Sequence, residues 1–261
     1  MIMKDTTSRP PWIPLTTSIV FVLRHIRILG WSLLLVTVTG MLTWFGYVEA
    51  LDFITGLTGH FFQQPPEYTG IRGWFVVKGW VVLKYMFFLV IRIAAFYLSF
   101  LAAYCLTSPG YVLLSTAVEK KYLGPLFVKD QGFSVSGMFR DIIEGCKIGV
   151  VGIAVTVIAL FANFIPIGGL GIVLLMYTFY SALMFVDYPA SRHRWTLGRK
   201  ISWVRRHVAA SLRLGVFPAL ISMIPLVNIF FMALLFPLFT VHTTLNFLAI
   251  EKWHDQQQQT R

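Results

Sequence analysis

The sequence predicts an all-α integral membrane protein with two long transmembrane helices, two proline-broken helical hairpins that partly re-enter the membrane, and interfacial amphipathic helices. Of its 261 residues, 57% are hydrophobic and only 13% are charged, whereas soluble domains carry about 25% charged residues. Its apolar runs are long enough to cross a membrane, and two of them contain a central Ile-Pro pair. Such a chain could not cover itself with a polar surface.

The first predicted span is the uncharged run of residues 28–48, which ends at Glu49. Its length matches a hydrocarbon core of about 30 Å. Arg24 and Arg27 directly precede it, so the positive-inside rule places residues 1–27 in the cytoplasm. The stretch from Glu49 to about Gly73 contains the letters QQPPEYTG and is predicted to be an external loop.

The second predicted span covers residues 74–107 and is longer than a membrane crossing needs. Lys78 and Lys84 in its first part can snorkel to the interface, whereas Arg92 lies deeper. We expect Ser108-Pro109-Gly110 to break this helix, because proline removes a backbone donor.

Residues 119–147 carry mixed charge and are predicted to be cytoplasmic. Apolar and charged side chains alternate here with helical spacing, which predicts an amphipathic helix at the membrane interface. One face carries Met138, Phe139, Ile142, Ile143 and Cys146, and the other carries Arg140, Asp141, Glu144 and Lys147.

The first predicted hairpin occupies the uncharged residues 148–186, which are too many for one crossing. The letters FIPIGG divide it into legs 148–164 and 170–186, each about 25 Å long as a helix. The segment 187–213 that follows is the most basic part of the chain. It carries Arg192, Arg194, Arg199, Lys200, Arg205, Arg206 and Arg213 against Asp187 alone.

The second predicted hairpin is broken at Ile224-Pro225. Its entering leg, residues 214–224, gives only about 16 Å of helix, so we expect the helix to start earlier, at Ile201, with an amphipathic first part. A hairpin returns the chain to the side from which it entered. The tail, residues 251–261, is therefore also expected in the cytoplasm.

Three short sequences carry a resemblance to a known family. FVDYPASRHRW at 185–195, SMIPLVNIFFM at 222–232 and FIPIGG at 164–169 resemble, in order and spacing, the family of the bacterial sulfate permease CysZ and the etoposide-induced membrane proteins. The resemblance implies one membrane domain over residues 1–261 that forms homo-oligomers in the bacterial inner membrane. It also implies inward movement of sulfate for cysteine synthesis. The family-motif residues for which we expect structural roles are Pro166, Asp187, Tyr188, Pro189 and Pro225.

Three arginines are candidates for anion binding. Arg24 and Arg27 are one helical turn apart, and guanidinium forks suit an oxyanion; Arg27 also matches the arginine of the family's Gly-hydrophobic-Arg motif. The alternative is that both bind lipid phosphate as membrane anchors. Arg92 within an apolar run is a functional candidate, or else a snorkelling or oligomer-interface arginine.

The hairpin tips are further candidates. Backbone N–H groups at Gly168 and Gly169 could face an anion, as broken membrane helices do for anionic substrates, and Asn228 could serve the second tip; alternatively, these residues only shape turns. Asp187-Tyr188-Pro189 is expected to cap a helix end and fix a bend. His242, in the last apolar leg, is expected to be a hydrogen-bonded core histidine.

These observations favour a sulfate or related oxyanion permease or channel. The alternative is a non-transporting membrane organiser that binds lipid or a partner protein. The sequence has no catalytic signature, P-loop or metal-ligand spacing, so we expect no enzyme activity, no cofactor and no metal. The net charge of +11 could suggest nucleic-acid binding, but the cations flank apolar runs. We therefore expect oxyanions, membrane lipids and further copies of the chain as partners, and no nucleic acid.

Overall fold

The computed structural model describes residues 11–63, 70–127 and 135–259. Within these residues, five helices are long and apolar enough to cross a membrane, and no strand is present. The all-helical membrane class is therefore confirmed. The chain forms two compact units: residues 1–37 with 105–261, called here the core unit, and residues 38–104, called the two-helix unit.

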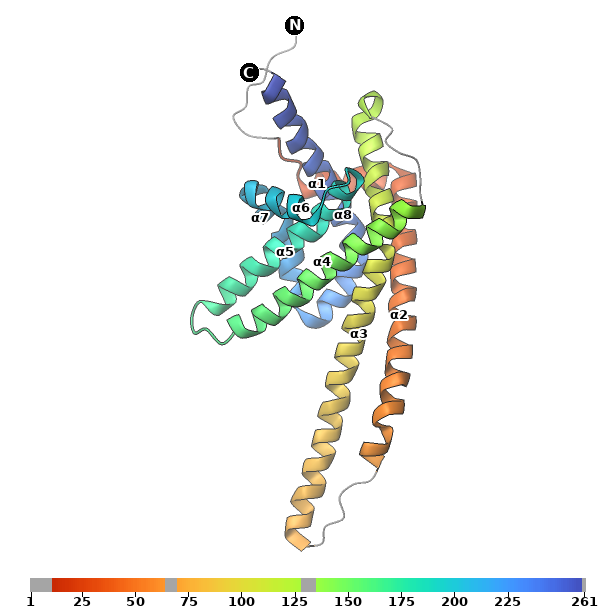
Figure 1. Ribbon diagram of the computed structural model, residues 1–261, viewed down its shortest axis with the longest axis vertical. Helices are drawn as coiled ribbons and strands as arrows, with labels where there is room; N and C mark the ends of the chain where they lie inside the picture. The colour runs from red at the N-terminus through yellow and green to blue at the C-terminus, as the bar shows by residue number, and fades with distance from the viewer. Residues whose placement is uncertain (1–10, 64–69, 128–134, 260–261) are drawn as a thin grey trace. The chain divides into compact units, whose positions relative to one another are not determined.

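The two-helix unit pairs the later part of α2 (Ile26–Gln63) with the earlier part of α3 (Gly70–Leu123), which run antiparallel (Figure 1). The helices approach closely at Gly46, where an added Cβ would lie 3.2 Å from Ser99 Cβ. The neighbouring rings of Tyr47 and Phe96 meet edge to face at 5.7 Å. The outer surface of this helix pair is apolar; Trp44, for example, is 63% exposed. The pair is therefore suited to surroundings of lipid hydrocarbon.

Both long helices exceed their predicted ends. α2 continues past Glu49 to Gln63, so most of the predicted loop between Glu49 and Gly73 is helical. Glu49 is exposed, and an exposed carboxylate does not have to end a helix.

The predicted break at Ser108-Pro109-Gly110 is also wrong, because α3 passes through Pro109 and reaches Leu123. α4 (Val135–Ala162) supports the helix at this point. Ser108 Oγ donates to the Asp141 carbonyl at 3.3 Å, and an added Cβ on Gly145 would meet Ser108 at 3.0 Å. A proline is tolerated inside a helix when a neighbouring helix packs at the break.

The first hairpin consists of α4 and α5 (Gly169–Arg192), which lie side by side and join at residues 163–168, called here the first tip (Figure 1). The predicted break at FIPIGG is therefore confirmed. Both legs are longer than predicted, since α4 begins at Val135 and α5 ends at Arg192. A short 3-10 turn, η1 (Gly124–Leu126), follows α3.

The predicted amphipathic segment of residues 138–147 is the first part of α4 rather than a separate interfacial helix. Its faces do not divide into buried apolar and exposed charged residues: Glu144 is only 8% exposed, whereas Phe139 and Ile143 are 64% and 55% exposed. Arg140 and Lys147 are exposed as well. A helix whose apolar side chains point outward is suited to lipid surroundings. The segment therefore belongs to the hairpin leg.

The second hairpin consists of α7 (Val208–Ser222) and α8 (Pro225–Gln259), preceded by α6 (Leu197–Arg206). The break at Ile224-Pro225 is confirmed, with Pro225 as the first residue of α8, where its missing N–H costs nothing. The expected continuous helix from Ile201 is wrong, because the chain breaks at His207, with φ −110° and ψ 50°. The backbone N–H and the ring Nδ1 of His207 both bond to the Trp203 carbonyl, at 2.9 and 3.0 Å.

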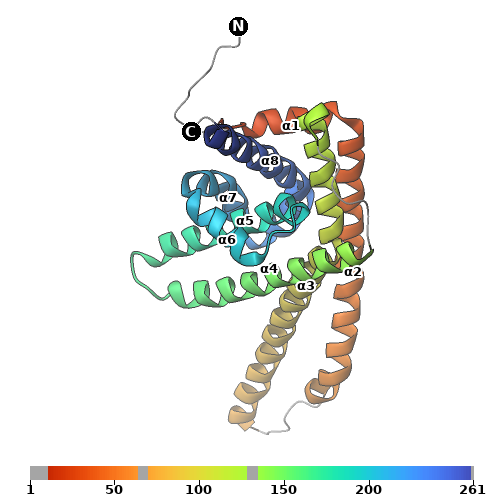
Figure 2. The ribbon, with the colours of Figure 1, turned by 45° about the horizontal axis from the view of Figure 1, so that its top comes forward.

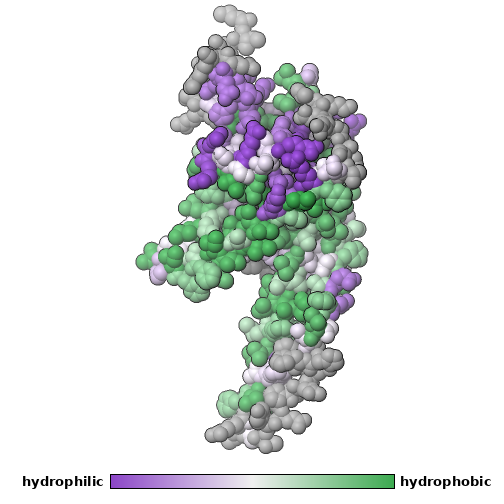
Figure 3. Space-filling view, viewed as in Figure 1, coloured by the Kyte–Doolittle hydropathy of each residue, from purple (hydrophilic) through white to green (hydrophobic). Residues whose placement is uncertain are grey.

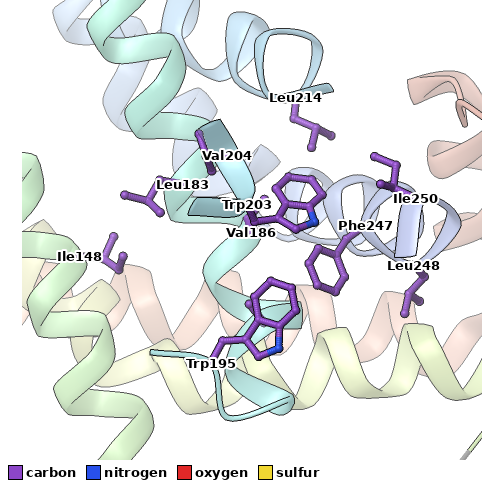
Figure 4. Packing of buried hydrophobic residues seen from close by; sticks show 11 residues of the cluster. Ile148, Leu183, Val186, Trp195, Trp203, Val204, Leu214, Phe247, Leu248 and Ile250 are labelled. Carbon is purple, nitrogen blue, oxygen red and sulfur yellow. The ribbon is translucent and has the colours of Figure 1, made fainter. Parts of the chain in front are cut away.

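Aromatic rings fill the centre of the core unit (Figure 4). Phe247 of α8 lies between two indoles, 5.4 Å from Trp195 and 5.3 Å from Trp203 between ring centroids. The guanidinium of Arg199 lies 4.1 Å above the Trp195 ring. This cluster joins α5, α6 and α8.

A short helix that the sequence did not predict, α1 (Leu15–Arg24), packs beside α8 (Figure 2). Ser18 of α1 is fully buried in this contact. On the visible face, hydrophilic residues gather over α6 and the C-terminal end of α8, and hydrophobic residues cover the α4–α5 hairpin (Figure 3). This distribution suits a hairpin in lipid next to helices that contact water.

Candidate functional site

A buried cluster of charges lies at the meeting point of α4, α5 and α6. Lys200 is 0% exposed. Its Nζ donates to Asp187 Oδ1 at 2.6 Å, to Ser191 Oγ at 3.0 Å and to Glu144 Oε2 at 3.4 Å. All three donors of the ammonium are therefore used, and the charge is balanced by carboxylates.

The sequence places these groups by simple helical spacing. Asp187 and Ser191 are one turn apart on α5, where Ser191 Oγ also donates to Asp187 Oδ1 at 3.3 Å. Lys200 is in the first turn of α6, and Glu144 is on α4, where it also pairs with Lys147 at 2.6 Å. Burying an ion costs several kcal/mol unless its partners surround it, so this ammonium fixes three helices relative to one another.

A second buried ion pair joins Glu119 of α3 to Arg192 at the end of α5. The Arg192 guanidinium also lies 4.4 Å above the Phe127 ring, and His193 Nε2 lies 4.0 Å from Glu119 Oε2. Arg192 is thus held by contacts within the protein rather than presented to a solute.

Asp187, Tyr188 and Pro189 lie inside α5, which continues to Arg192. The expectation that they cap a helix end is therefore wrong. Tyr188 is buried, with its ring 5.3 Å from that of Tyr111. The tight packing of this turn against α3 explains why the helix continues through a proline.

Arg24 and Arg27 are exposed, but they do not share one helical face. Arg24 is the last residue of α1, and Arg27 is in the first turn of α2. His25 separates them with a non-helical φ of −115°, and its Nδ1 lies 2.7 Å from the Phe21 carbonyl. Arg92 is exposed on α3 in the two-helix unit. In the part of the chain that the structure describes, these arginines form no ion pair.

The first tip uses its own backbone donors. The Gly168 N–H donates to the Pro166 carbonyl at 2.7 Å and the Gly169 N–H to the Ile165 carbonyl at 3.2 Å. The expectation that these N–H groups face an anion is therefore wrong. Ile167 adopts a φ of 66°, a left-handed conformation that is uncommon for a β-branched residue.

Asn228 is in the first turn of α8, after Pro225. Its backbone is therefore helical and does not form the turn itself. The predicted role of its amide group concerns a side chain that lies outside the described residues.

A pocket that no sequence pattern indicates lies between the start of α1 with its preceding segment, α7 and α8. It has a volume of about 200 Å³, several times the roughly 30 Å³ that a water molecule takes up in the liquid. Arg213 and His242 are its titratable residues. Its lining consists of Trp12, Leu15, Arg213, Leu214, Val216, Phe217, Phe239 and His242.

His242 is buried and bonded, as expected, through a 2.9 Å contact between Nδ1 and Ser18 Oγ. Neither Arg213, one cation of a basic segment, nor Trp12 is singled out by a sequence pattern. The two lie far apart in sequence, and the guanidinium lies 5.4 Å from the Trp12 ring centroid. Only the unpredicted docking of α1 and its preceding segment brings them together.

The comparisons with known proteins agree with the motifs. The family described as sulfate transporter CysZ/etoposide-induced protein 2.4 matches residues 15–233. This range begins at α1 and includes both hairpin tips, so it extends further toward the N-terminus than the resemblance noted in the sequence. Among curated proteins, none matches the chain. Because the match covers most of its length, the chain belongs to the sulfate transporter CysZ/etoposide-induced protein 2.4 family.

Proposed function

We propose that this protein is a permease or channel for sulfate or a related oxyanion in the bacterial inner membrane, where it supplies sulfur for cysteine synthesis. The observation that carries the proposal is the family match over residues 15–233. The five long apolar helices support a protein that crosses the membrane several times. The proposal includes no catalytic step, cofactor or metal.

The distribution of cations supports an anion path that avoids the buried charges. Lys200 and Arg192 are each satisfied by buried carboxylates, so neither has charge to offer a passing solute. Arg24 and Arg27 are exposed near the start of α2. An exposed guanidinium keeps its planar fork available for an oxyanion, so these residues are the preferred capture positions.

The proposal places both termini in the cytoplasm and assembles the protein as a homo-oligomer in contact with membrane lipids. In support, exposed cations of α6 such as Arg205 and Arg206 follow the first hairpin, as the positive-inside rule expects of a cytoplasmic segment. Exposed apolar side chains such as Phe164 and Leu170 require lipid or another copy of the chain around the hairpin.

Uptake of radiolabelled sulfate into liposomes containing the purified protein tests this function. We expect uptake above that of empty liposomes, and Arg27→Ala should weaken sulfate capture about 10- to 100-fold, the usual effect of losing charge-assisted hydrogen bonds. Arg205→Ala is the matched control, since Arg205 is an exposed arginine on α6. A folded protein that takes up no more sulfate than empty liposomes would overturn the proposal.

The second candidate is a membrane organiser that binds lipid without transport. It is favoured by the break between Arg24 and Arg27, which separates the expected anion-binding pair, and by the apolar first tip. Expression in a bacterial strain that lacks sulfate uptake separates the two candidates. Restored growth on sulfate supports the permease, and absence of growth with normal membrane insertion supports the organiser.

A further inference from the structure

The pocket lined by Trp12, Arg213 and His242 has the composition of an oxyanion-binding site. Its residues come from four segments of the core unit: the stretch before α1, the first residue of α1, α7 and α8. No acidic side chain is part of its lining. A bound anion would therefore meet a cation without a competing carboxylate.

The hydrogen bonds around His242 fix its ring in the wall of the pocket. The backbone N–H of Ile13 donates to Asn246 Oδ1 at 2.9 Å. A backbone N–H can only donate, so this contact identifies the amide oxygen of Asn246. The amide nitrogen then lies 3.1 Å from the Ile13 carbonyl, 3.0 Å from the His242 carbonyl and 3.3 Å from His242 Nδ1.

Nδ1 of His242 lies 2.9 Å from the Ser18 hydroxyl, and that hydroxyl also donates to the Pro14 carbonyl at 3.4 Å. A hydroxyl can donate to a ring nitrogen or accept from it. These contacts hold the imidazole in place in the wall of the pocket. Trp12 meets this ring edge to face at 5.7 Å and holds its orientation.

Arg213 supplies the charge. Its side chain is exposed, and its guanidinium lies 5.4 Å from the Trp12 ring centroid. Contact with an aromatic face leaves the N–H groups in the guanidinium plane free to donate. Two parallel N–H groups match two oxygens of an oxyanion.

We propose that this pocket binds a single oxyanion group, held by the Arg213 fork beside the imidazole of His242. The remaining walls, such as Phe217 and Phe239, are apolar, so they suit an uncharged remainder of the ligand. The chemistry is shared by a free sulfate or phosphate ion and by the phosphate of a lipid headgroup. The site is separate from Arg24 and Arg27, and it goes beyond the proposed capture of sulfate there.

The test measures binding by the full chain. Isothermal titration of the purified protein with sulfate and with inorganic phosphate examines the free ion. Native mass spectrometry after reconstitution with phosphatidylglycerol examines the lipid headgroup. Arg213→Gln should weaken binding in one of these two assays about 10- to 100-fold.

Two controls make the result specific to the pocket. Arg205→Gln removes another exposed arginine of the core unit and should leave binding unchanged. Arg27→Ala should leave the Arg213-dependent binding unchanged even where it reduces sulfate uptake, so failure of this site and failure of the proposed transport are distinguishable. Loss of titratable sulfate or phosphate binding in Arg213→Gln identifies a free ion, and loss of retained lipid identifies a headgroup. A folded Arg213→Gln variant that binds ion and lipid like the unmodified protein would overturn the proposal.

Discussion

Replacing Lys200 with methionine removes the ammonium that joins α4, α5 and α6 while keeping a side chain of similar length. The Asp187 carboxylate is only 3% exposed. Of the hydrogen bonds described above, it then keeps only the one from the Ser191 hydroxyl. Glu144 retains Lys147 at 2.6 Å. Removing one partner of a buried ion pair costs about 3–5 kcal/mol because the other charge stays buried.

This cost predicts a large shift of the melting temperature. For a chain of 150–250 residues, 1 kcal/mol shifts Tm by about 2–4 °C, so Lys200→Met should lower Tm by about 6–20 °C. The assay is thermal unfolding of the purified protein in detergent, followed by size-exclusion chromatography of the heated samples. Lys252→Met, at an exposed lysine on α8, is the matched control and should leave Tm within about 2 °C, as surface substitutions usually do.

A double variant, Lys200→Met with Asp187→Leu, separates the lost pair from simple misfolding. It removes both charges, and replacing a buried pair by apolar side chains is often neutral or stabilising. We expect it to recover most of the lost Tm. A Lys200→Met variant as stable as the control, or a double variant no better than the single one, would refute the argument that the ammonium compensates a buried carboxylate.

Three further predictions concern packing, pH and topology. Gly215→Ala places a Cβ against the backbone of α5 and should destabilise the protein by about 1–3 kcal/mol, which is measured as a lower Tm. Gly171→Ala is the control: an added Cβ there has nothing within 4 Å, so its Tm should stay unchanged. Burial lowers the pKa of His207, so below the usual pKa of about 6.5 the unfolded state binds a proton first. Stability should therefore fall with pH below that value, and His207→Gln should show a shallower fall in Tm. Single cysteines at Arg199 and Gln257, in a chain without its native cysteines, should react with a membrane-impermeant reagent from the same face; labelling from opposite faces would contradict the two hairpins.

The hairpin tips could be predicted because their signal is local. Pro166 and Pro225 each interrupt an uncharged run that is too long for one crossing, and the physics of a missing N–H needs no knowledge of the rest of the chain. The ends of α2 and α3 could not be predicted in the same way. Pro109 stays helical because α4 packs against Ser108, and that contact is tertiary.

The charged cluster could not be predicted because its members are far apart in sequence. Lys200 and Glu144 are separated by 56 positions, so Lys200 was one cation among seven in the segment 187–213. The expectation for Asp187 is wrong because a proline such as Pro189 normally ends a helix, whereas the buried packing of Tyr188 keeps this helix intact. The pocket was missed because its two sides come from opposite ends of the chain.

The hydrogen bonds at the first tip affect how deeply the first hairpin can insert into the membrane. Gly168 and Gly169 donate within the turn, while Phe164, Ile165 and Ile167 point outward at 79%, 49% and 108% exposure. N–H groups that are bonded within the turn need no outside partner among the acyl chains. These internal bonds and the outward apolar side chains together lower the cost of placing the first tip in hydrocarbon.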